Sequence, residues 1–156
     1  MIEKATFGAG CFWKTEDKFS GVKGVIKTSV GYMGGDFANP SYLDVLARIT
    51  GHAEVSQIEY DPDIIDYEQL LEIFWNIHDP TSLNRQGADR GEQYRSVIFY
   101  HTPEQEKIAR KSKQQLQLSG KCDRDLVTEI KPASDYYLAD EYHQQYLAKK
   151  RLGNRE

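Results

Sequence analysis

The stretch Ile2-Glu3-Lys4-Ala5-Thr6-Phe7-Gly8-Ala9-Gly10-Cys11-Phe12-Trp13 contains the change of periodicity that decides the fold. Residues 2–7 alternate weakly between apolar and polar and end at three small residues, which is typical of a strand entering a turn. From Cys11 to Phe19, positions 12, 15, 16 and 19 repeat at spacings of three and four, which predicts a helix. The stretch therefore predicts a strand–turn–helix unit with a thiol at its junction.

Outward from this unit, predicted strands and helices alternate along the chain. The alternating or apolar segments predict strands at 25–32, 54–60, 96–101 and 126–130, and the helical periodicities predict helices at 66–78, 102–118 and 139–151. Ser41 is predicted to cap a short helix through Ala47, with Asp44 completing a capping box. Interleaved elements predict an α/β (α+β) fold, a two-layer α/β sandwich or plait of the ferredoxin-like kind with a mixed sheet. The long polar segment 81–94 is predicted to be a functional loop.

Length and composition limit the class of protein. A chain of 156 residues has the size of one domain, so we expect a single catalytic domain over 1–156. The net charge of −4 shows no basic footprint for nucleic acid. There is no signal-peptide pattern and no apolar run of roughly 20 residues, so we expect a cytoplasmic protein without a membrane partner, and a monomer. Two cysteines are too few for a disulfide scaffold or a cysteine-rich zinc site.

Cys11 is the residue on which the functional interpretation depends. A thiol at the start of a helix lies near unpaired backbone N–H groups and the positive end of the helix dipole, so its pKa is expected to be lowered. The alternative is an inert, packed cysteine, since cysteine is often buried. Phe12 and Trp13 have two readings as well: core packing, or an apolar slot for a methyl group beside the nucleophile.

Two further clusters carry polar chemistry. Glu54, in Gly51-His52-Ala53-Glu54, is either a solvated carboxylate or, if it is enclosed, a general acid whose pKa is raised by desolvation. The segment 84–96 is either a surface connection or a loop that brings Asp89 and Tyr94 to the same pocket. His52 and the other three histidines lack a metal-ligand spacing, so no metal is expected.

Taken together, these stretches resemble the class A peptide-methionine (S)-S-oxide reductases, the methionine sulfoxide reductase A family. The resemblance extends over roughly residues 5–147, in the family's order. The matching pieces are Phe7-Gly8-Ala9-Gly10-Cys11-Phe12-Trp13, Gly31-Tyr32-Met33-Gly34-Gly35, Asn39-Pro40-Ser41-Tyr42, Thr50-Gly51-His52-Ala53-Glu54-Val55, Tyr60-Asp61-Pro62, Phe74-Trp75, His78-Asp79-Pro80-Thr81, the run 84–96, and Tyr142-His143-Gln144-Gln145-Tyr146-Leu147.

The resemblance implies an activity and a role for each site residue. The chain would reduce the S epimer of methionine sulfoxide, free or in proteins, as a repair enzyme. Cys11 would attack the sulfoxide sulfur and become a sulfenic acid, which a small thiol or thioredoxin-like donor would reduce. Neither a metal nor an organic cofactor is implied. The other implied roles are a proton source in Glu54, hydrogen bonds to the oxygen from Tyr42 and Tyr94 with support from Asp89, and a methyl slot in Phe12 and Trp13.

The sequence departs from the family pattern at two places. Many members carry a resolving cysteine in a C-terminal tail, whereas the tail 149–156 has none. Cys122 is the only other thiol and therefore a possible resolving thiol, although direct reduction by an external donor is the favoured interpretation. Lys14 stands where many relatives have glycine. It is either a solvated helix residue or, as a hypothesis, a charge that stabilises the Cys11 thiolate.

Two other functions stay open from the sequence. Cys11 with His52 could serve a peroxidatic thiol protein or an acyl transferase. A non-catalytic plait module could instead bind peptides through its aromatic surface.

Overall fold

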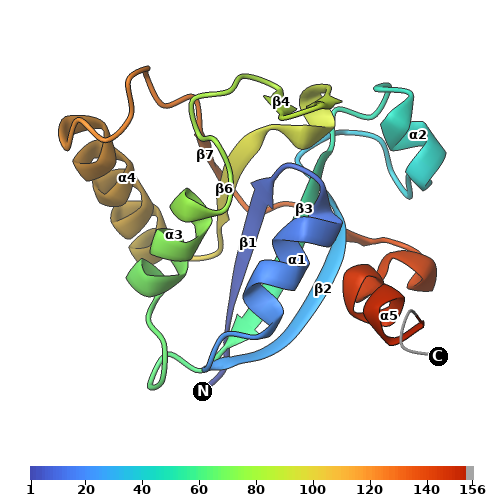
Figure 1. The fold of residues 1–156 in the computed structure, drawn as a ribbon, viewed down its shortest axis with the longest axis horizontal. Helices are drawn as coiled ribbons and strands as arrows, with labels where there is room; N and C mark the ends of the chain where they lie inside the picture. The colour runs from blue at the N-terminus through green and yellow to red at the C-terminus, as the bar shows by residue number, and fades with distance from the viewer. Residues whose placement is uncertain (154–156) are drawn as a thin grey trace.

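The computed structural model of the protein describes residues 1–153 and is built around a six-stranded sheet (Figure 1). Residues 154–156, the last three of the C-terminal tail 149–156 that contains no cysteine, lie outside the described residues. The elements are β1 (Glu3–Ala9), α1 (Phe12–Ser20), β2 (Val25–Met33), α2 (Tyr42–Leu46), β3 (Ala53–Tyr60), α3 (Tyr67–Asn76), β4 (Arg85–Gln86), β5 (Asp89–Arg90), η1 (Glu92–Tyr94), β6 (Ser96–Tyr100), α4 (Pro103–Leu118), β7 (Glu129–Pro132), β8 (Tyr137–Leu138), η2 (Glu141–His143) and α5 (Tyr146–Gly153).

The sheet has the strand order β7-β6-β1-β3-β2-β8. All neighbouring strands are antiparallel except β6 and β7, which are parallel. The predicted α/β class and mixed sheet are therefore confirmed. The ferredoxin-like detail stays a prediction.

One face of the sheet and the helices against it enclose the main core. Phe7 of β1 stacks on Phe19 of α1, with ring centroids 5.4 Å apart, and also contacts Phe74 of α3 at 5.1 Å. Figure 1 shows α1 lying across β1, β2 and β3, with α3 and α4 beside it. Because β1 is held between two strands and beneath α1, the turn at its end has a rigid support.

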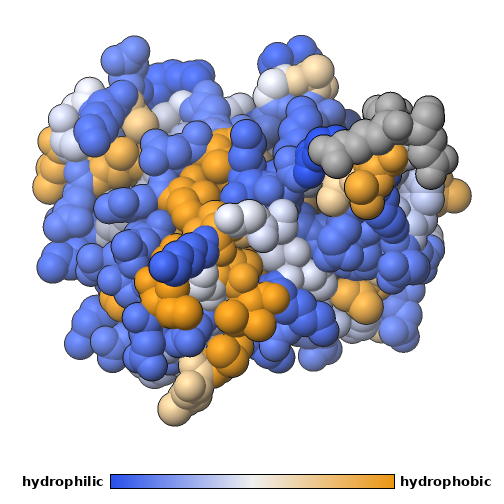
Figure 2. Space-filling model, turned by 60° about the horizontal axis from the view of Figure 1, so that its bottom comes forward, coloured by the Kyte–Doolittle hydropathy of each residue, from blue (hydrophilic) through white to orange (hydrophobic). Residues whose placement is uncertain are grey.

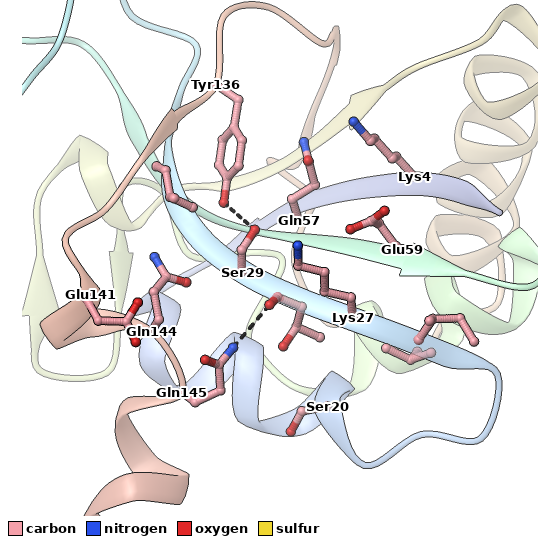
Figure 3. A pocket seen from close by; sticks show the side chains of 14 residues that line it. Lys4, Ser20, Lys27, Ser29, Gln57, Glu59, Tyr136, Glu141, Gln144 and Gln145 are labelled. Carbon is pink, nitrogen blue, oxygen red and sulfur yellow. Dashed lines mark hydrogen bonds between the residues drawn. The ribbon is translucent and has the colours of Figure 1, made fainter.

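A cavity of about 780 Å³ lies along β2 away from the Cys11 end of α1, and both polar and apolar side chains line it. Figure 3 shows Ser29 hydrogen-bonded to Tyr136 at 2.8 Å in this cavity, with Lys27, Gln57 and Glu59 around it. None of the predicted site residues lines it.

Three segments differ from the sequence-based prediction. The loop 81–94 folds as the hairpin β4–β5 followed by η1, with Gly87 at φ 59° in the hairpin turn. The strand predicted at 126–130 is β7, which spans residues 129–132. It accommodates Pro132 because β7 is an edge strand, where an absent N–H is tolerated.

The last helix begins at Tyr146 rather than at Ala139, because side chains in the preceding segment bond β2 and α1. Gln144 accepts from the Val30 N–H at 2.9 Å and donates to the Val30 carbonyl at 2.9 Å. The Gln145 N–H donates to Glu16 at 2.8 Å. These contacts dock the segment against the sheet as β8 and η2 instead of a continuous helix.

Two further expectations concern membranes and the oligomeric state. In residues 1–153, no helix has the length and apolar content that a bilayer span requires. Figure 2 shows a band of apolar surface across one face of the molecule. The monomeric state stays a prediction.

Candidate functional site

Cys11 lies where β1 passes into α1. Gly10 has φ 96°, a left-handed conformation that L side chains rarely adopt, and a Cβ there would lie 3.0 Å from Gln86 Cβ. The chain can therefore turn sharply and place the thiol at the helix end. Cys11 is the N-cap residue, and the first helical residue is Phe12, so the helix predicted from 11 begins one residue later.

Glu54 reaches the same helix end from β3. Its side chain is 1% exposed, and its Oε1 accepts the N–H of Phe12 at 3.2 Å. The other carboxyl oxygen, Oε2, has no hydrogen-bond partner among the described residues. Burial raises the pKa of Glu54 to about 8, against the lowering effect of the Phe12 N–H. The carboxyl group is thus enclosed and holds its proton at neutral pH. Of the two interpretations drawn from the sequence, this agrees with the enclosed general acid and not with the solvated carboxylate.

The pKa of Cys11 differs from the prediction. Burial, together with the charges of Glu54 and Asp89, raises the pKa of the thiol to about 11. The backbone N–H groups of Trp13 and Lys14 favour the thiolate but do not outweigh these effects. The prediction that the pKa of Cys11 is lowered was therefore wrong. It considered the backbone N–H groups at the helix end but not the desolvation of the buried thiol, which has the larger effect. At neutral pH both Cys11 and Glu54 carry protons.

Three polar residues from separate segments surround this pair. Tyr42 opens α2, whose capping box of Ser41 and Asp44 is present as predicted. Asp89 lies on β5 and Tyr94 ends η1. Burial and the charges of Glu54 and Asp89 raise the pKa values of Tyr42 and Tyr94, so both hydroxyls stay protonated donors. The structure therefore groups the four predicted polar residues, Glu54, Tyr42, Asp89 and Tyr94, around the Cys11 thiol.

An aromatic cluster adjoins Tyr42 and the start of α1. The Trp13 ring stacks on Tyr146 with centroids 3.8 Å apart, and its Nε1–H donates to His143 Nδ1 at 3.0 Å. His143 also lies 4.4 Å from Tyr42 and 5.5 Å from Phe12, measured between ring centroids. Sequence reasoning assigned His143 and Tyr146 no role, because the segment was read as one helix. Both residues lie in Tyr142–Leu147, one of the stretches that resemble the family, and this is the feature of the sequence that could have identified them.

Tyr32 is a third residue to which the sequence analysis assigns no role. It lies directly opposite Glu54 in the β2–β3 register, is 1% exposed, and packs on Phe12 at 5.6 Å between centroids. Its hydroxyl has no hydrogen-bond partner in the described chain. The strand alternation of 25–32 placed it in a strand but could not show which strand faced it.

A cavity of about 430 Å³ opens at Cys11. Its wall along α1 carries Lys14 and Lys18, and the hairpin contributes Gln86, Gly87 and Asp89. Lys14 therefore faces the site, although its backbone N–H, rather than its ammonium group, favours the Cys11 thiolate. Cys122 is half-buried between α4 and β7 and is not among the side chains that line this cavity.

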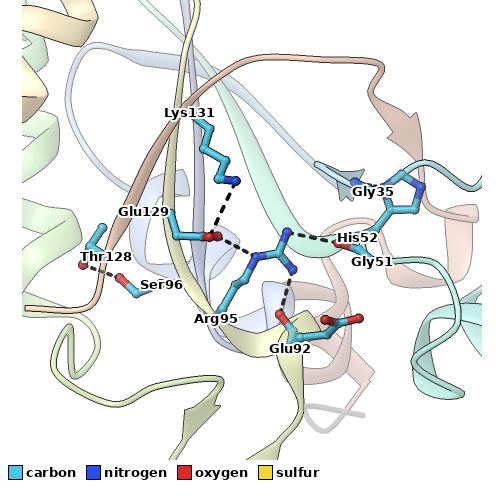
Figure 4. Close-up of polar contacts among 9 residues, drawn as sticks. All are labelled: Gly35, Gly51, His52, Glu92, Arg95, Ser96, Thr128, Glu129 and Lys131. Atoms are coloured by element: carbon cyan, nitrogen blue, oxygen red, sulfur yellow. Dashed lines mark hydrogen bonds and ion pairs between the residues drawn. The ribbon is translucent and has the colours of Figure 1, made fainter.

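Arg95 and His52 form hydrogen bonds that connect the segments next to the site residues (Figure 4). The Arg95 guanidinium donates to Glu129 at 2.9 Å and to the backbone carbonyls of Glu92 and Gly51 at 2.9 and 3.1 Å. It thus links β7 and η1 to the segment before β3.

His52 accepts the Gly35 N–H at Nδ1, 2.9 Å away, and donates from Nε2 to the Phe37 carbonyl at 2.7 Å. Both ring nitrogens are engaged by backbone, so His52 has no nitrogen left to serve as a base for Cys11. This weakens the alternative of a Cys11–His52 acyl transferase. In residues 1–153, no three His, Cys, Asp or Glu side chains are grouped as metal ligands would be.

Comparisons with known proteins agree with this geometry. The profile of the family described as peptide methionine sulfoxide reductase matches residues 3–156. The peptide methionine sulfoxide reductase MsrA 1 of Nostoc sp. is 66% identical over 149 residues, covering 96% of this chain and 91% of the relative.

Solved structures show the same fold. Methionine sulfoxide reductase A of Corynebacterium diphtheriae has a TM-score of 0.91 at 35% identity, covering 97% of this chain and 76% of that one. Saccharomyces cerevisiae Mxr1 in complex with Trx2 has a TM-score of 0.66 at 26% identity, covering 93% of this chain and 84% of that one. From the sequence match over nearly its whole length, the chain belongs to the peptide methionine sulfoxide reductase family.

Proposed function

We propose that this protein reduces the S epimer of methionine sulfoxide to methionine, with Cys11 as the nucleophile. The observation that carries the proposal is the enclosed Glu54 carboxyl group, which is protonated at neutral pH and shares the α1 N-terminus with the Cys11 thiol. A sulfoxide oxygen leaves poorly unless it is protonated. A nucleophile and a resident acid at one point meet both requirements.

The reaction balances with the residues present. The Cys11 sulfur attacks the sulfoxide sulfur, Glu54 gives its proton to the sulfoxide oxygen, and the thiol proton passes to Glu54. The bond between the two sulfur atoms and the bond between the substrate sulfur and oxygen then break as the oxygen bonds to the Cys11 sulfur. Methionine leaves, and Cys11 remains as a sulfenic acid.

The two sides of the site account for epimer selectivity. Tyr42 and Tyr94 donate hydrogen bonds to the oxygen, with Asp89 behind them, while Phe12 and Trp13 receive the methyl group. A substrate sulfur whose oxygen and methyl group are both fixed presents only one face to Cys11. Both free and peptide-bound methionine sulfoxide are proposed as substrates, which makes the enzyme one of protein repair.

An external thiol completes the cycle. A small thiol or a thioredoxin-like protein attacks the sulfenic acid to form a mixed disulfide and water, and a second thiol releases Cys11 as the free thiol. Support comes from the cavity at Cys11, which gives a donor access, and from Mxr1, which is described in complex with Trx2. Cys122 as the resolving thiol is the less favoured route, because it does not line that cavity.

A cytoplasmic location and a single catalytic domain over 1–156 belong to the same proposal. Cys11 and Cys122 are both free thiols, the form that a reducing compartment maintains. The site draws its residues from the turn after β1 and from α1, α2, β3, β5 and η1, so the reaction needs the sheet as a whole rather than one part of it.

The test is reduction of the separated S and R epimers with dithiothreitol. Wild type is expected to convert the S epimer only, Cys11→Ser to convert neither, and the matched variant Cys122→Ser to retain S-epimer conversion. Absence of S-epimer conversion by wild type would refute the proposal. Peroxide or ester turnover that required His52 would support the alternative thiol enzymes, and peptide binding without turnover would support the module.

A further inference from the structure

Two unpartnered polar atoms on facing strands lie beside the site. Among residues 1–153, only four buried side-chain oxygen or nitrogen atoms have no protein hydrogen-bond partner: Tyr32 Oη, Glu54 Oε2, Tyr67 Oη and Gln93 Oε1. Two of the four belong to Tyr32 and Glu54, which are directly paired across β2 and β3. Directly paired residues in antiparallel strands have side chains on the same face, about 5 Å apart at Cβ.

Both side chains are buried against Phe12, the first residue of α1. Phe12 joins them, because its ring packs on Tyr32 and its backbone N–H binds Glu54 Oε1. Each side chain is 1% exposed, so bulk solvent does not satisfy either oxygen. A buried polar atom without a partner is costly, and two such atoms that are too far apart for a direct bond are commonly joined by one water molecule.

We propose that Tyr32 is a positioning residue, which acts through one buried water bound between its hydroxyl and Glu54 Oε2. The inference rests on the proposed function, in which Oε2 holds the proton given to the sulfoxide oxygen. The water accepts from Tyr32 and donates to Glu54 once that proton has left. A buried water forms about three hydrogen bonds, and the sulfoxide oxygen is the third partner available there.

The sign of the effect follows from which form of Glu54 is stabilised. A donor chain from Tyr32 stabilises the ionised carboxylate, so removing the hydroxyl raises the pKa of Glu54 further. Other groups act on the same carboxyl: Asp89 raises the pKa of Glu54, and Cys11, Tyr42 and Tyr94 face it from α1, α2 and η1. Asp140 acts on Tyr32 from the segment before η2. None of these groups is altered by a change confined to the Tyr32 hydroxyl.

Tyr67 supplies a matched control. Its hydroxyl is also buried without a protein partner, but it belongs to α3 and to the main core beside Phe7. Tyr32→Phe and Tyr67→Phe therefore remove the same group from two buried positions, and only the first faces Glu54.

The experiment measures kcat against pH for wild type and both variants, with S-methionine sulfoxide and dithiothreitol. Tyr32→Phe is expected to lower kcat about three- to tenfold and to move the alkaline limb upward by roughly half a pH unit, the size of one hydrogen bond's effect. Tyr67→Phe is expected to match wild type in both respects. An alkaline limb and kcat for Tyr32→Phe equal to those of Tyr67→Phe would overturn the assignment.

A second measurement does not depend on activity. The pH dependence of urea unfolding between pH 5 and 9 also reports the titration of Glu54, and Tyr32→Phe is expected to steepen the loss of stability above pH 7 while Tyr67→Phe does not. If wild type fails to reduce methionine sulfoxide, the proposed function fails, while this unfolding result still supports or overturns the water site by itself.

Discussion

Glu54→Gln tests the state of the buried carboxyl group directly. The pKa of Glu54 rises from its ordinary 4.5 to about 8 on folding. At 1.36 kcal/mol per pH unit, this difference is worth about 5 kcal/mol, and no discount for solvent is needed at 1% exposure. The folded state binds the proton more tightly than the unfolded chain, so wild type loses stability as pH rises from about 4.5 to about 8. Glutamine does not titrate, and its carbonyl can still accept the Phe12 N–H.

The assay is urea unfolding of both proteins at pH 5, 7 and 9. The stability of Glu54→Gln relative to wild type is expected to increase by about 4 kcal/mol between pH 5 and 9, most of it below pH 8. The variant's absolute stability also includes the cost of a buried amide N–H₂ group, but that cost is independent of pH. Glu72→Gln, at an exposed position on α3, should show the pH dependence of wild type. Parallel curves for wild type and Glu54→Gln would refute the argument that Glu54 is protonated in the folded protein.

Three further predictions concern the regeneration of Cys11, the contacts of Arg95 and the hydrogen bond from Tyr94 to the substrate oxygen. Cys122→Ser should sustain multiple turnovers with dithiothreitol at a rate within about twofold of wild type, and mass spectrometry of wild type after a single turnover should find no Cys11–Cys122 disulfide; turnover of Cys122→Ser that stops after one cycle would instead identify Cys122 as the resolving thiol. Arg95→Ala should lower the free energy of unfolding by about 1–3 kcal/mol, because it leaves the Glu92 and Gly51 carbonyls without this donor and removes the ion pair with the partly exposed Glu129, whereas Arg110→Ala, which breaks a surface i,i+4 pair, should cost less than about 1 kcal/mol in the same urea titration. Tyr94→Phe should lower kcat by about 10- to 100-fold with little change in KM, and an unchanged kcat would remove its hydroxyl from the reaction.

The sequence predicted the elements best where periodicity and capping agreed. The strand–turn–helix unit around Cys11, the capping box of Ser41 and Asp44, and the helix after Asp66 all appear within one or two residues of their predicted bounds. The segment 139–145 was misread as helix because its conformation depends on contacts distant in sequence. Gln144 and Gln145 bond β2 and α1, and no local pattern encodes that.

The candidate site shows the same division between local and distant information. Cys11 and Glu54 were identified from their motifs, but whether Glu54 was enclosed depended on the packing of α1 over β3. The same enclosure reversed the expected direction of the Cys11 pKa, since desolvation outweighs the backbone N–H groups. Tyr32 was missed because its importance comes from its partner across the sheet, and the β2–β3 register is visible only in the structure.

The central claim is that Cys11 itself takes the oxygen from the sulfoxide. Its most direct test is a single turnover without any reducing thiol, with S-methionine sulfoxide in excess and the sulfenic acid trapped by dimedone for peptide mass spectrometry. The account predicts about one methionine per chain and one trapped adduct, on the peptide that contains Cys11. Methionine formed without an adduct on Cys11, or in equal amount by Cys11→Ser, would contradict it.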